Sequence, residues 1–382
     1  MTDKERFLRC MSYESVDRVP LLDLGFWAET LDAWRKEGLP DDVKVPHTDS
    51  FFGMDGFMRF YVSPEATDAH CLVDRGMVVQ EGIRVGLVPL FEERVIEDLG
   101  GQEIFQCGDG ALLRRHKRMS SIPFHMGHLL KDKRSWEQHY APKLDPTTGE
   151  RYPKNWAPLL KTAKDTDREH ILLLPGGSLY GWLRNWMGLE NVSLALHDDP
   201  VWFEKMVDTV FHCILGVLKK TLDRGGTYDA CLFWEDMCYN HGPLISPTHF
   251  RRLLSPRYEA ICRFLEGHGV RTIIVDTDGR VNEIVPLFLN AGVNCLLPIE
   301  IGTTGMDPVS LRREFGRDLR IIGGVDKRIL SRGPSAIDEE VRRLRPLMEE
   351  GGFIPTCDHK VPPDVPYVHY CHFLRCLGAW PS

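Results

Sequence analysis

Residues 271–279, with the sequence RTIIVDTDG, show the pattern that decides the fold: a short apolar run that ends in two aspartates and a glycine. Continuously apolar runs of this length are typical of strands buried on both faces of a parallel sheet. Apolar residues with helical spacing occur on either side, in residues 247–265 and 282–289. The stretch therefore predicts a strand between two helices of an α/β protein.

The same alternation extends over about residues 170–382. Predicted strands span 171–174, 229–234, 271–275, 293–299, 319–322 and 352–355, and predicted helices span about 200–224, 247–265, 282–289, 308–315, 336–348 and 367–373. Asp199 and Pro200 are an N-cap residue and a first-turn proline for the first of these helices. With the apolar run Val19–Leu24 as a seventh strand, and with no Gly-x-Gly-x-x-Gly turn, the pattern favours a (β/α)8 TIM barrel over a doubly wound sheet. One strand of that barrel remains unassigned.

Residues from about 50 to 160 do not follow this repeat. Strands are predicted at 87–91, 93–96, 103–107 and 112–117, with turns at Gly100-Gly101 and at residues 108–110. We interpret this region as a β-hairpin insertion in the N-terminal third, packed on the barrel. The whole chain, residues 1–382, is thus predicted to be one domain.

Composition excludes several classes of function. The chain has 47 Lys and Arg against 55 Asp and Glu, a net charge of −8, which argues against a nucleic acid or an anionic membrane as the main partner. No apolar run approaches the roughly 18 residues of a membrane span. The charged start, Met1–Arg6, lacks the apolar segment of a signal peptide, so we expect a cytoplasmic protein. Eleven cysteines without a Cys-x-x-Cys pair indicate reduced, buried thiols and no disulfide scaffold.

Candidate site residues follow from the fold, because a TIM barrel carries its active site at the carboxyl ends of its strands. The residues in or directly after predicted strands are Asp23, Trp234, Glu235, Asp236, Asp276, Asp278, Glu300, Cys357 and His359. Carboxylates that converge cannot all stay charged without a cation, a proton or a positively charged ligand. The alternative is that strand-to-helix loops are polar in any case and that individual aspartates cap the next helix.

Asp276, Asp278 and Cys357 form the most specific group. Two carboxylates two residues apart at a strand end can face one site, and a thiolate from the last strand would complete a set of oxygen and sulfur ligands that suits zinc or another divalent metal. His359 or Glu235 would be a further ligand. Alternatively, Asp276 caps a helix, Asp278 binds a substrate amine or hydroxyl, and Cys357 is packed in the core.

Four segments resemble the uroporphyrinogen decarboxylase family over nearly the whole chain. They are residues 6–20 (RFLRCMSYESVDRVP), 91–98 (FEERVIED), 323–328 (GGVDKR) and 351–366 (GGFIPTCDHKVPPDVP), of which the last is the most specific. The resemblance implies a (β/α)8 barrel. It also implies one of two activities, either porphyrinogen decarboxylation or methyl transfer to or from a corrinoid protein.

The residues favour the methyltransferase branch. Decarboxylases of the family carry an arginine-rich stretch soon after the first strand, whereas residues 21–29 here read LLDLGFWAE, and an acidic site would repel a polyanionic porphyrinogen. Methyltransferases of the family bind zinc through a His-x-Cys motif and a late cysteine. Asp276 and Asp278 occupy the first two places and Cys357 the last. Because aspartates replace the histidine and the first cysteine of this motif, the resemblance implies a methyltransferase that acts on the methyl donor and does not activate a thiol acceptor.

We therefore expect a methyltransferase that moves a methyl group from a small methoxylated or methylated-amine substrate to the cob(I)alamin of a separate corrinoid protein. Zinc held by Asp276, Asp278 and Cys357 would assist the leaving oxygen, with Glu235, Asp236 and Asp278 as acid or orienting groups. Substrate contacts are predicted at Asp23, Trp234, Glu300 and His359. The chain has no Asp-x-His-x-x-Gly corrinoid segment, so cobalamin would arrive on the partner.

Two other functions stay open at this stage. One is a lyase of the same family that decarboxylates a small carboxylic acid, and the other is a degenerate barrel that only binds a ligand. Stoichiometric zinc would favour the methyltransferase over both. A quaternary ammonium donor would need no acid, because the carboxylates would simply attract the cation. A homodimer is compatible with the sequence but is not indicated by any feature of it.

Overall fold

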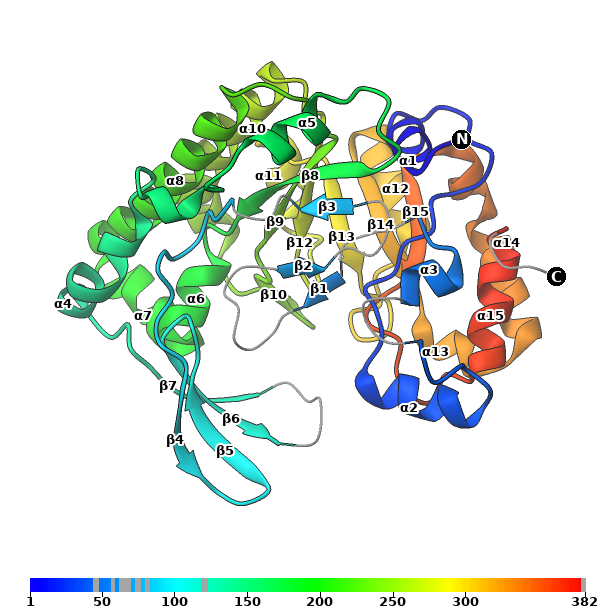
Figure 1. Ribbon diagram of the computed structural model, residues 1–382, viewed down its shortest axis with the longest axis horizontal. Coiled ribbons are helices and arrows are strands. Elements are labelled where there is room, and N and C mark those ends of the chain that lie inside the picture. Colours follow the sequence, from blue (N-terminus) through cyan, green and yellow to red (C-terminus); the bar gives the residue numbers. More distant parts are fainter. Residues whose placement is uncertain are drawn as a thin grey trace.

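The computed structural model describes residues 1–43, 48–55, 59–61, 70–72, 77–79, 83–117 and 123–378. Its centre is a seven-stranded parallel sheet in the order β15-β14-β13-β12-β9-β8-β3 (Figure 1). These strands are β3 (Met77–Val79), β8 (Ile171–Gly177), β9 (Ala230–Trp234), β12 (Thr272–Asp276), β13 (Cys295–Ile299), β14 (Arg320–Val325) and β15 (Phe353–Cys357). The six strands predicted between residues 170 and 360 are confirmed.

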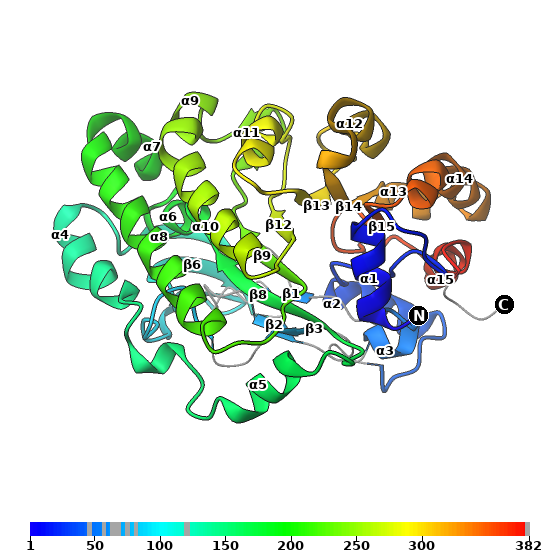
Figure 2. The ribbon, with the colours of Figure 1, turned by 90° about the horizontal axis from the view of Figure 1, so that it is seen from above.

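Helices follow the strands and cover the outside of the sheet. The main ones are α8 (Pro200–Leu222), α10 (Ser255–Gly267), α11 (Val285–Asn290), α12 (Pro308–Phe315) and α14 (Pro334–Glu350). Figure 2 shows them in an arc around the strands. The predicted start of α8 is confirmed, because the Asp199 side chain accepts a hydrogen bond from the Trp202 amide and Pro200 occupies the first turn.

Smaller elements complete the described part of the chain. The helices are α1 (Asp3–Met11), α2 (Ala28–Lys36), α3 (Thr48–Phe52), α4 (Lys133–Ser135), α5 (Ala157–Lys164), α6 (Gly181–Met187), α7 (Leu189–Asp198), α9 (Pro247–His249), α13 (Lys327–Leu330) and α15 (Tyr367–Cys376). Short π and 3-10 turns are η1 (Trp136–Tyr140), η2 (Ala141–Leu144), η3 (Gly149–Arg151), η4 (Phe250–Leu254) and η5 (Gly316–Asp318), and β10 (Cys238–Tyr239) pairs with β11 (Gly242–Pro243). In the described ranges, no helix combines the length and apolar character needed to cross a bilayer.

Both faces of the parallel sheet are buried, as continuous apolar strands require. Successive strand residues alternate between two clusters. One cluster packs against the helices. Its members from β8, β9, β12 and β15 are Leu172, Leu174, Cys231, Phe233, Ile273, Val275 and Phe353. The other lies on the opposite face and includes Leu173, Leu232, Ile274 and Ile354 together with Phe7, Cys10 and Met11 of α1 and Leu22 and Leu24. The sheet is therefore held by hydrophobic burial from two sides.

The prediction of a strand at Val19–Leu24 is wrong. The Leu21 amide donates to the buried Asp55 carboxylate at 2.8 Å, and the Leu21 carbonyl accepts from the Asp55 amide at 3.0 Å. The backbone of Leu21 is thus hydrogen-bonded to Asp55 and not to a neighbouring strand. One parallel bridge joins Phe26 to Val361. Asp55 also pairs with Arg6 and Arg18. The described strands consequently form a parallel sheet with β3 and β15 at its ends, and closure into an eight-stranded barrel is not shown.

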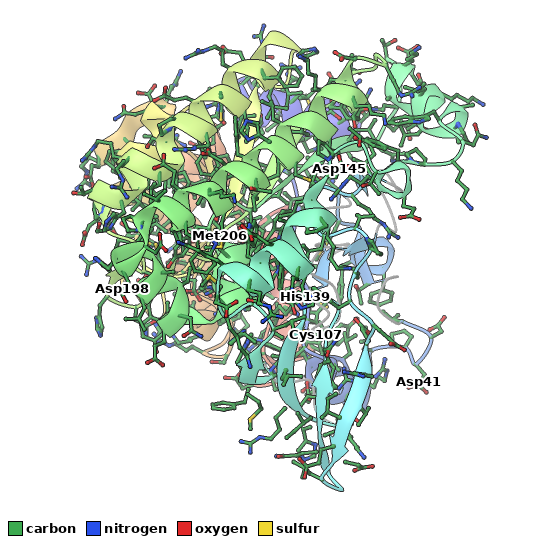
Figure 3. All side chains as sticks on the ribbon, turned by 90° about the vertical axis from the view of Figure 1, so that its left-hand side faces the viewer. Asp41, Cys107, His139, Asp145, Asp198 and Met206 are labelled. Atoms are coloured by element: carbon green, nitrogen blue, oxygen red, sulfur yellow. The ribbon has the colours of Figure 1, made fainter. Side chains whose placement is uncertain are left out.

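An antiparallel sheet projects from the parallel one (Figure 1). Its strands, in order, are β4 (Arg94–Asp98), β5 (Gln102–Gln106), β6 (Ala111–His116) and β7 (Phe124–His128). The predicted insertion is confirmed here, but β7 was not predicted. Residues 87–91 are not a strand. Figure 3 shows Cys107 at the base of this sheet. β1 (Arg59–Tyr61) pairs with β2 (His70–Leu72), and the rest of the predicted insertion around them lies partly outside the described residues.

The starts of β8 and β9 are fixed by a buried ion pair. Arg168 Nη2 donates to both carboxylate oxygens of Asp229 at 2.8 Å, and Asp229 accepts the Leu172 amide at 2.6 Å. The two side chains are only 3% and 4% exposed. Removal of one partner would leave the other charge buried without compensation.

We expect Arg168→Ala to lower the free energy of unfolding by about 3–5 kcal/mol, measured by urea denaturation. The control is Lys205→Ala, which breaks the exposed ion pair between Lys205 and Glu137 and should leave stability within experimental error. Equal effects of the two substitutions would contradict this role for Arg168.

Candidate active site at the carboxyl ends of the strands

Four carboxylic acids gather after β9, β12 and β13. Burial raises the pKa of Asp276 well above its usual value, and the charges of Asp278, Asp236 and Glu300 raise it further. Within the described residues, Asp276 lies in register with Trp234 of β9 and Leu297 of β13, and its carbonyl accepts the Glu235 amide at 2.8 Å. The parallel ladders thus bring these strand ends together, as the sequence predicted.

Asp278 is the accessible member of this acidic group. Its side chain is 39% exposed. Its pKa is raised to about 8 by burial of its surroundings and by the charges of Asp236 and Glu300, against the opposing effect of Lys327 and Arg184. Asp278 therefore holds a proton at neutral pH and can present it to a bound molecule.

His359 lies next to Asp278 but does not neutralise it. The His359 Nε2 atom is 3.6 Å from Asp278 Oδ2, which is a close contact but longer than a hydrogen bond. Burial, followed by the charges of Lys327 and Lys360, lowers the pKa of His359 to about 4, so the imidazole is neutral at pH 7. Its ring stacks on Trp27 with the centroids 6.4 Å apart.

Asp236 is held by a cation from another element. Arg184 of α6 pairs with the Asp236 carboxylate at 2.5 Å, and its guanidinium lies 5.7 Å from the centre of the Trp234 ring. The backbone of Asp236 has φ of 42°, a left-handed conformation that is uncommon for residues other than glycine and is concentrated at functional sites. Asp236 therefore belongs to a fixed wall of the site and is already paired.

Gly279 permits the close packing of the loop after β12. It has φ of 85°, and a Cβ atom there would lie 2.6 Å from the Cys238 carbonyl carbon. Its amide donates to Glu300 Oε2 at 2.9 Å, which fixes that carboxylate beside the loop. Only glycine meets both conditions without displacement of the chain.

Glu235, predicted as an acid or an orienting group, is enclosed by hydrogen-bond donors. Its buried carboxylate accepts hydrogen bonds from the amides of Leu179, Tyr180 and Gly181 at the start of α6, from the Ser178 hydroxyl at 3.0 Å, and from the Tyr258 hydroxyl. Burial raises the pKa of Glu235, while these donors oppose the rise. Since both oxygens are occupied, the geometry favours Glu235 as an anchor for the start of α6, the helix that carries Arg184, over an acid aimed at a substrate.

Asp23 and Cys357 lie in a neighbouring group. Asp23 accepts the Tyr370 hydroxyl at 2.6 Å and the Gly25 amide at 3.1 Å. The Cys357 thiol is fully buried, and burial with the charges of Asp23 and Asp358 raises its pKa well above the usual value. The charges that act on Cys357 are therefore those of Asp23 and Asp358, whereas Asp276 responds to Asp278, Asp236 and Glu300.

The predicted zinc ligands do not fit a metal as they are arranged. Among the described residues, the ligand atoms of Asp276, Asp278 and Cys357 do not gather within 4.8 Å of one another. Zinc needs ligand atoms that converge at about 2.0–2.3 Å from the ion. We therefore derive no chemistry at this site from a metal.

Two cations of the site were missed by the sequence reasoning. Lys327 Nζ pairs with the buried Asp358 at 3.0 Å, and Asp358 Oδ2 also accepts the amides of Ile301 and Gly302. Lys327 lies two residues beyond the end of β14, within reach of the strand-end rule. Arg184 gave no such signal, because it lies one turn into a helix.

Ionisable groups with shifted pKa values at the carboxyl ends of parallel strands are typical of α/β enzymes. The family model for uroporphyrinogen decarboxylase (URO-D) matches residues 184–380, just over half of the 382 residues, and the chain belongs to this family. A solved structure, a methyltransferase from Methanosarcina mazei, is similar to the chain with a TM-score of 0.57 and 13% identity, over 99% of this chain and 98% of that one. No curated protein sequence matches the chain.

The raised pKa values of Asp276 and Asp278 predict a pH-dependent stability. Asp278 titrates near 8 in the folded state and near 3.8 when unfolded, so the unfolded chain releases protons that the folded chain retains, and stability falls as pH rises from about 4 to about 8. Asp276→Asn removes one of the two carboxyl groups whose pKa is raised in the folded state. We expect a smaller loss of Tm between pH 5 and pH 8 in this variant than in the wild type, measured by calorimetry.

The exposed Asp41→Asn variant serves as the charge control, because it lies outside the acidic group. Its Tm should follow that of the wild type across the same pH range. Parallel curves for all three proteins would show that Asp276 is not buried among like charges.

Proposed function

We propose that the chain is a methyltransferase that takes a methyl group from a small methoxylated or methylated-amine donor and passes it to the cob(I)alamin of a separate corrinoid protein. The observation that carries the proposal is the position of Asp278, which is accessible beside His359 in an acidic group that raises its pKa. Membership of the URO-D family and the fold likeness to a methanogen methyltransferase support it. The acidic group would also repel the anionic substrates of a decarboxylase.

Asp278 is the proposed acid. An ether oxygen is a poor leaving group as an anion, and a proton delivered to it in the transition state removes the developing charge. The carbon–oxygen bond of the donor breaks with its electron pair on oxygen, the Asp278 proton goes to that oxygen, and the methyl carbon is taken by the partner's reduced corrinoid, which supplies the new electron pair. Asp278 is left as a carboxylate that must regain a proton before the next turnover.

The neighbouring residues prepare this proton. Asp236 and Glu300 keep the Asp278 proton in place, since their charges disfavour a further anion. His359 is neutral and adjacent, so it can accept a hydrogen bond from a substrate hydroxyl or donate one to a substrate oxygen. Trp234 beside Arg184 and Trp27 beside His359 offer aromatic surface for a methylated substrate.

The direct test is incubation with reduced corrinoid protein and a panel of methoxyaromatics and methylamines, with methylation followed by the cobalamin absorbance. For a methoxy donor, we expect Asp278→Asn to lower kcat by about 10²–10⁴-fold, as for loss of a general acid. The wild-type rate should fall as pH rises through about 8, where Asp278 loses its proton. Asp41→Asn should behave as the wild type.

A quaternary ammonium donor reverses the pH effect. Such a donor leaves as a neutral amine without an acid, and the ionised Asp278 would attract its charge, so the rate would rise above pH 8. A panel in which no donor methylates the corrinoid would defeat the proposal. A second panel of small carboxylic acids tests the lyase, and release of CO2 from one of them would favour that activity over methyl transfer.

A further inference from the structure

Three potential metal ligands meet between two helices outside the strand-end site. Asp338 lies on α14, and His372 and Cys376 lie four residues apart on one face of α15. Asp338 Oδ1 is 2.7 Å from His372 Nε2 and 3.2 Å from Cys376 Sγ, and that sulfur is 3.5 Å from the same His372 nitrogen. Among the described residues, this is the group in which three such atoms all lie within 4.8 Å of one another.

The arrangement does not fit an acid–base triad. In such a triad the acid and the nucleophile contact opposite nitrogens of the imidazole, so that a proton can be relayed through the ring. Here the carboxylate and the thiol both face Nε2 of His372. Three donor atoms that converge on one point are the geometry of a metal site.

The donor set matches zinc in chemistry and in size. An imidazole nitrogen, a sulfur and a carboxylate oxygen are the three ligand types that Zn²⁺ prefers. Zinc–ligand distances of about 2.0–2.3 Å in a tetrahedron place the ligand atoms about 3.3–3.6 Å apart. The distances involving sulfur, 3.2 and 3.5 Å, are already near this range, and only the 2.7 Å contact between Asp338 and His372 must open.

Access from solvent is also provided. The side chains of His372 and Asp338 are 24% and 46% exposed, and Cys376 is half-buried. Without an ion the thiol is protonated, because burial and Asp338 raise the pKa of Cys376 to about 11. A divalent cation would displace this proton to solvent and occupy the point that the three atoms share.

We propose that Asp338, His372 and Cys376 form a zinc site that joins α14 to α15, with the fourth position open to water. The site is separate from the strand-end carboxylates, and it does not depend on the proposed methyl transfer. The ion would hold the C-terminal helix against its neighbour and stabilise the folded state by mass action.

The test uses the full chain, freed of metal, titrated with Co²⁺ as a spectroscopic probe and with Zn²⁺ in competition. We expect about one equivalent of Co²⁺ to give a thiolate charge-transfer band and the visible spectrum of tetrahedral cobalt, and Zn²⁺ to abolish both. Zn²⁺ should also raise the Tm of the wild-type protein. Cys376→Ser should remove the charge-transfer band and the Tm increase.

Two controls make the outcome decisive. Cys371→Ser changes another cysteine of α15 that lies outside the ligand group, and it should keep the band. Asp278→Asn should also keep it. If the band survives Cys376→Ser, or is lost with Asp278→Asn, the metal binds somewhere other than between α14 and α15. The absence of any cobalt spectrum in the wild type would overturn the proposal.

Discussion

The carboxyl ends of β9, β12 and β13 force acidic side chains together in a place where water cannot fully screen them. The sheet is buried on both faces, so the direction of each strand is fixed by packing, and Asp276 has no freedom to turn its charge toward solvent. Protons therefore become part of the folded structure. The acid on Asp278 and the pairing of Asp236 with Arg184 follow from this crowding of charge. His359 is neutral for another reason, because burial and the charges of Lys327 and Lys360 lower its pKa.

Burial and neighbouring charges raise the pKa of Asp278, so the strand-end site can supply a proton. Cys357 lies apart from this acidic group, near the charges of Asp23 and Asp358. A carboxylic acid and a metal ion can serve the same purpose, since both remove charge from a leaving oxygen. In the proposed reaction, the proton of Asp278 serves this purpose.

Strand positions and the acidic group could be predicted because both follow from periodicity: apolar runs define the strands, and parallel strands end on one side. What could not be predicted depends on contacts between distant segments. The Val19–Leu24 run reads as a strand, yet its backbone bonds to Asp55. The sequence leaves Glu235 open as an acid or an orienting group, and only the structure shows that backbone amides of residues 179–181 bind its carboxylate. No local pattern reveals which buried carboxylate faces an amide and which faces a substrate.

Asp55 gives the first residues of the chain an importance that their position at the terminus would not suggest. Arg6 and Arg18 both pair with this carboxylate, which is 1% exposed, and Arg6 also binds Asp17. A shortened protein that begins after residue 18 would leave a negative charge inside the molecule without a counter-ion, at a cost of about 3–5 kcal/mol. Affinity tags and fusions therefore belong in front of an intact N-terminus, and trimming that end is a poor route to a minimal domain.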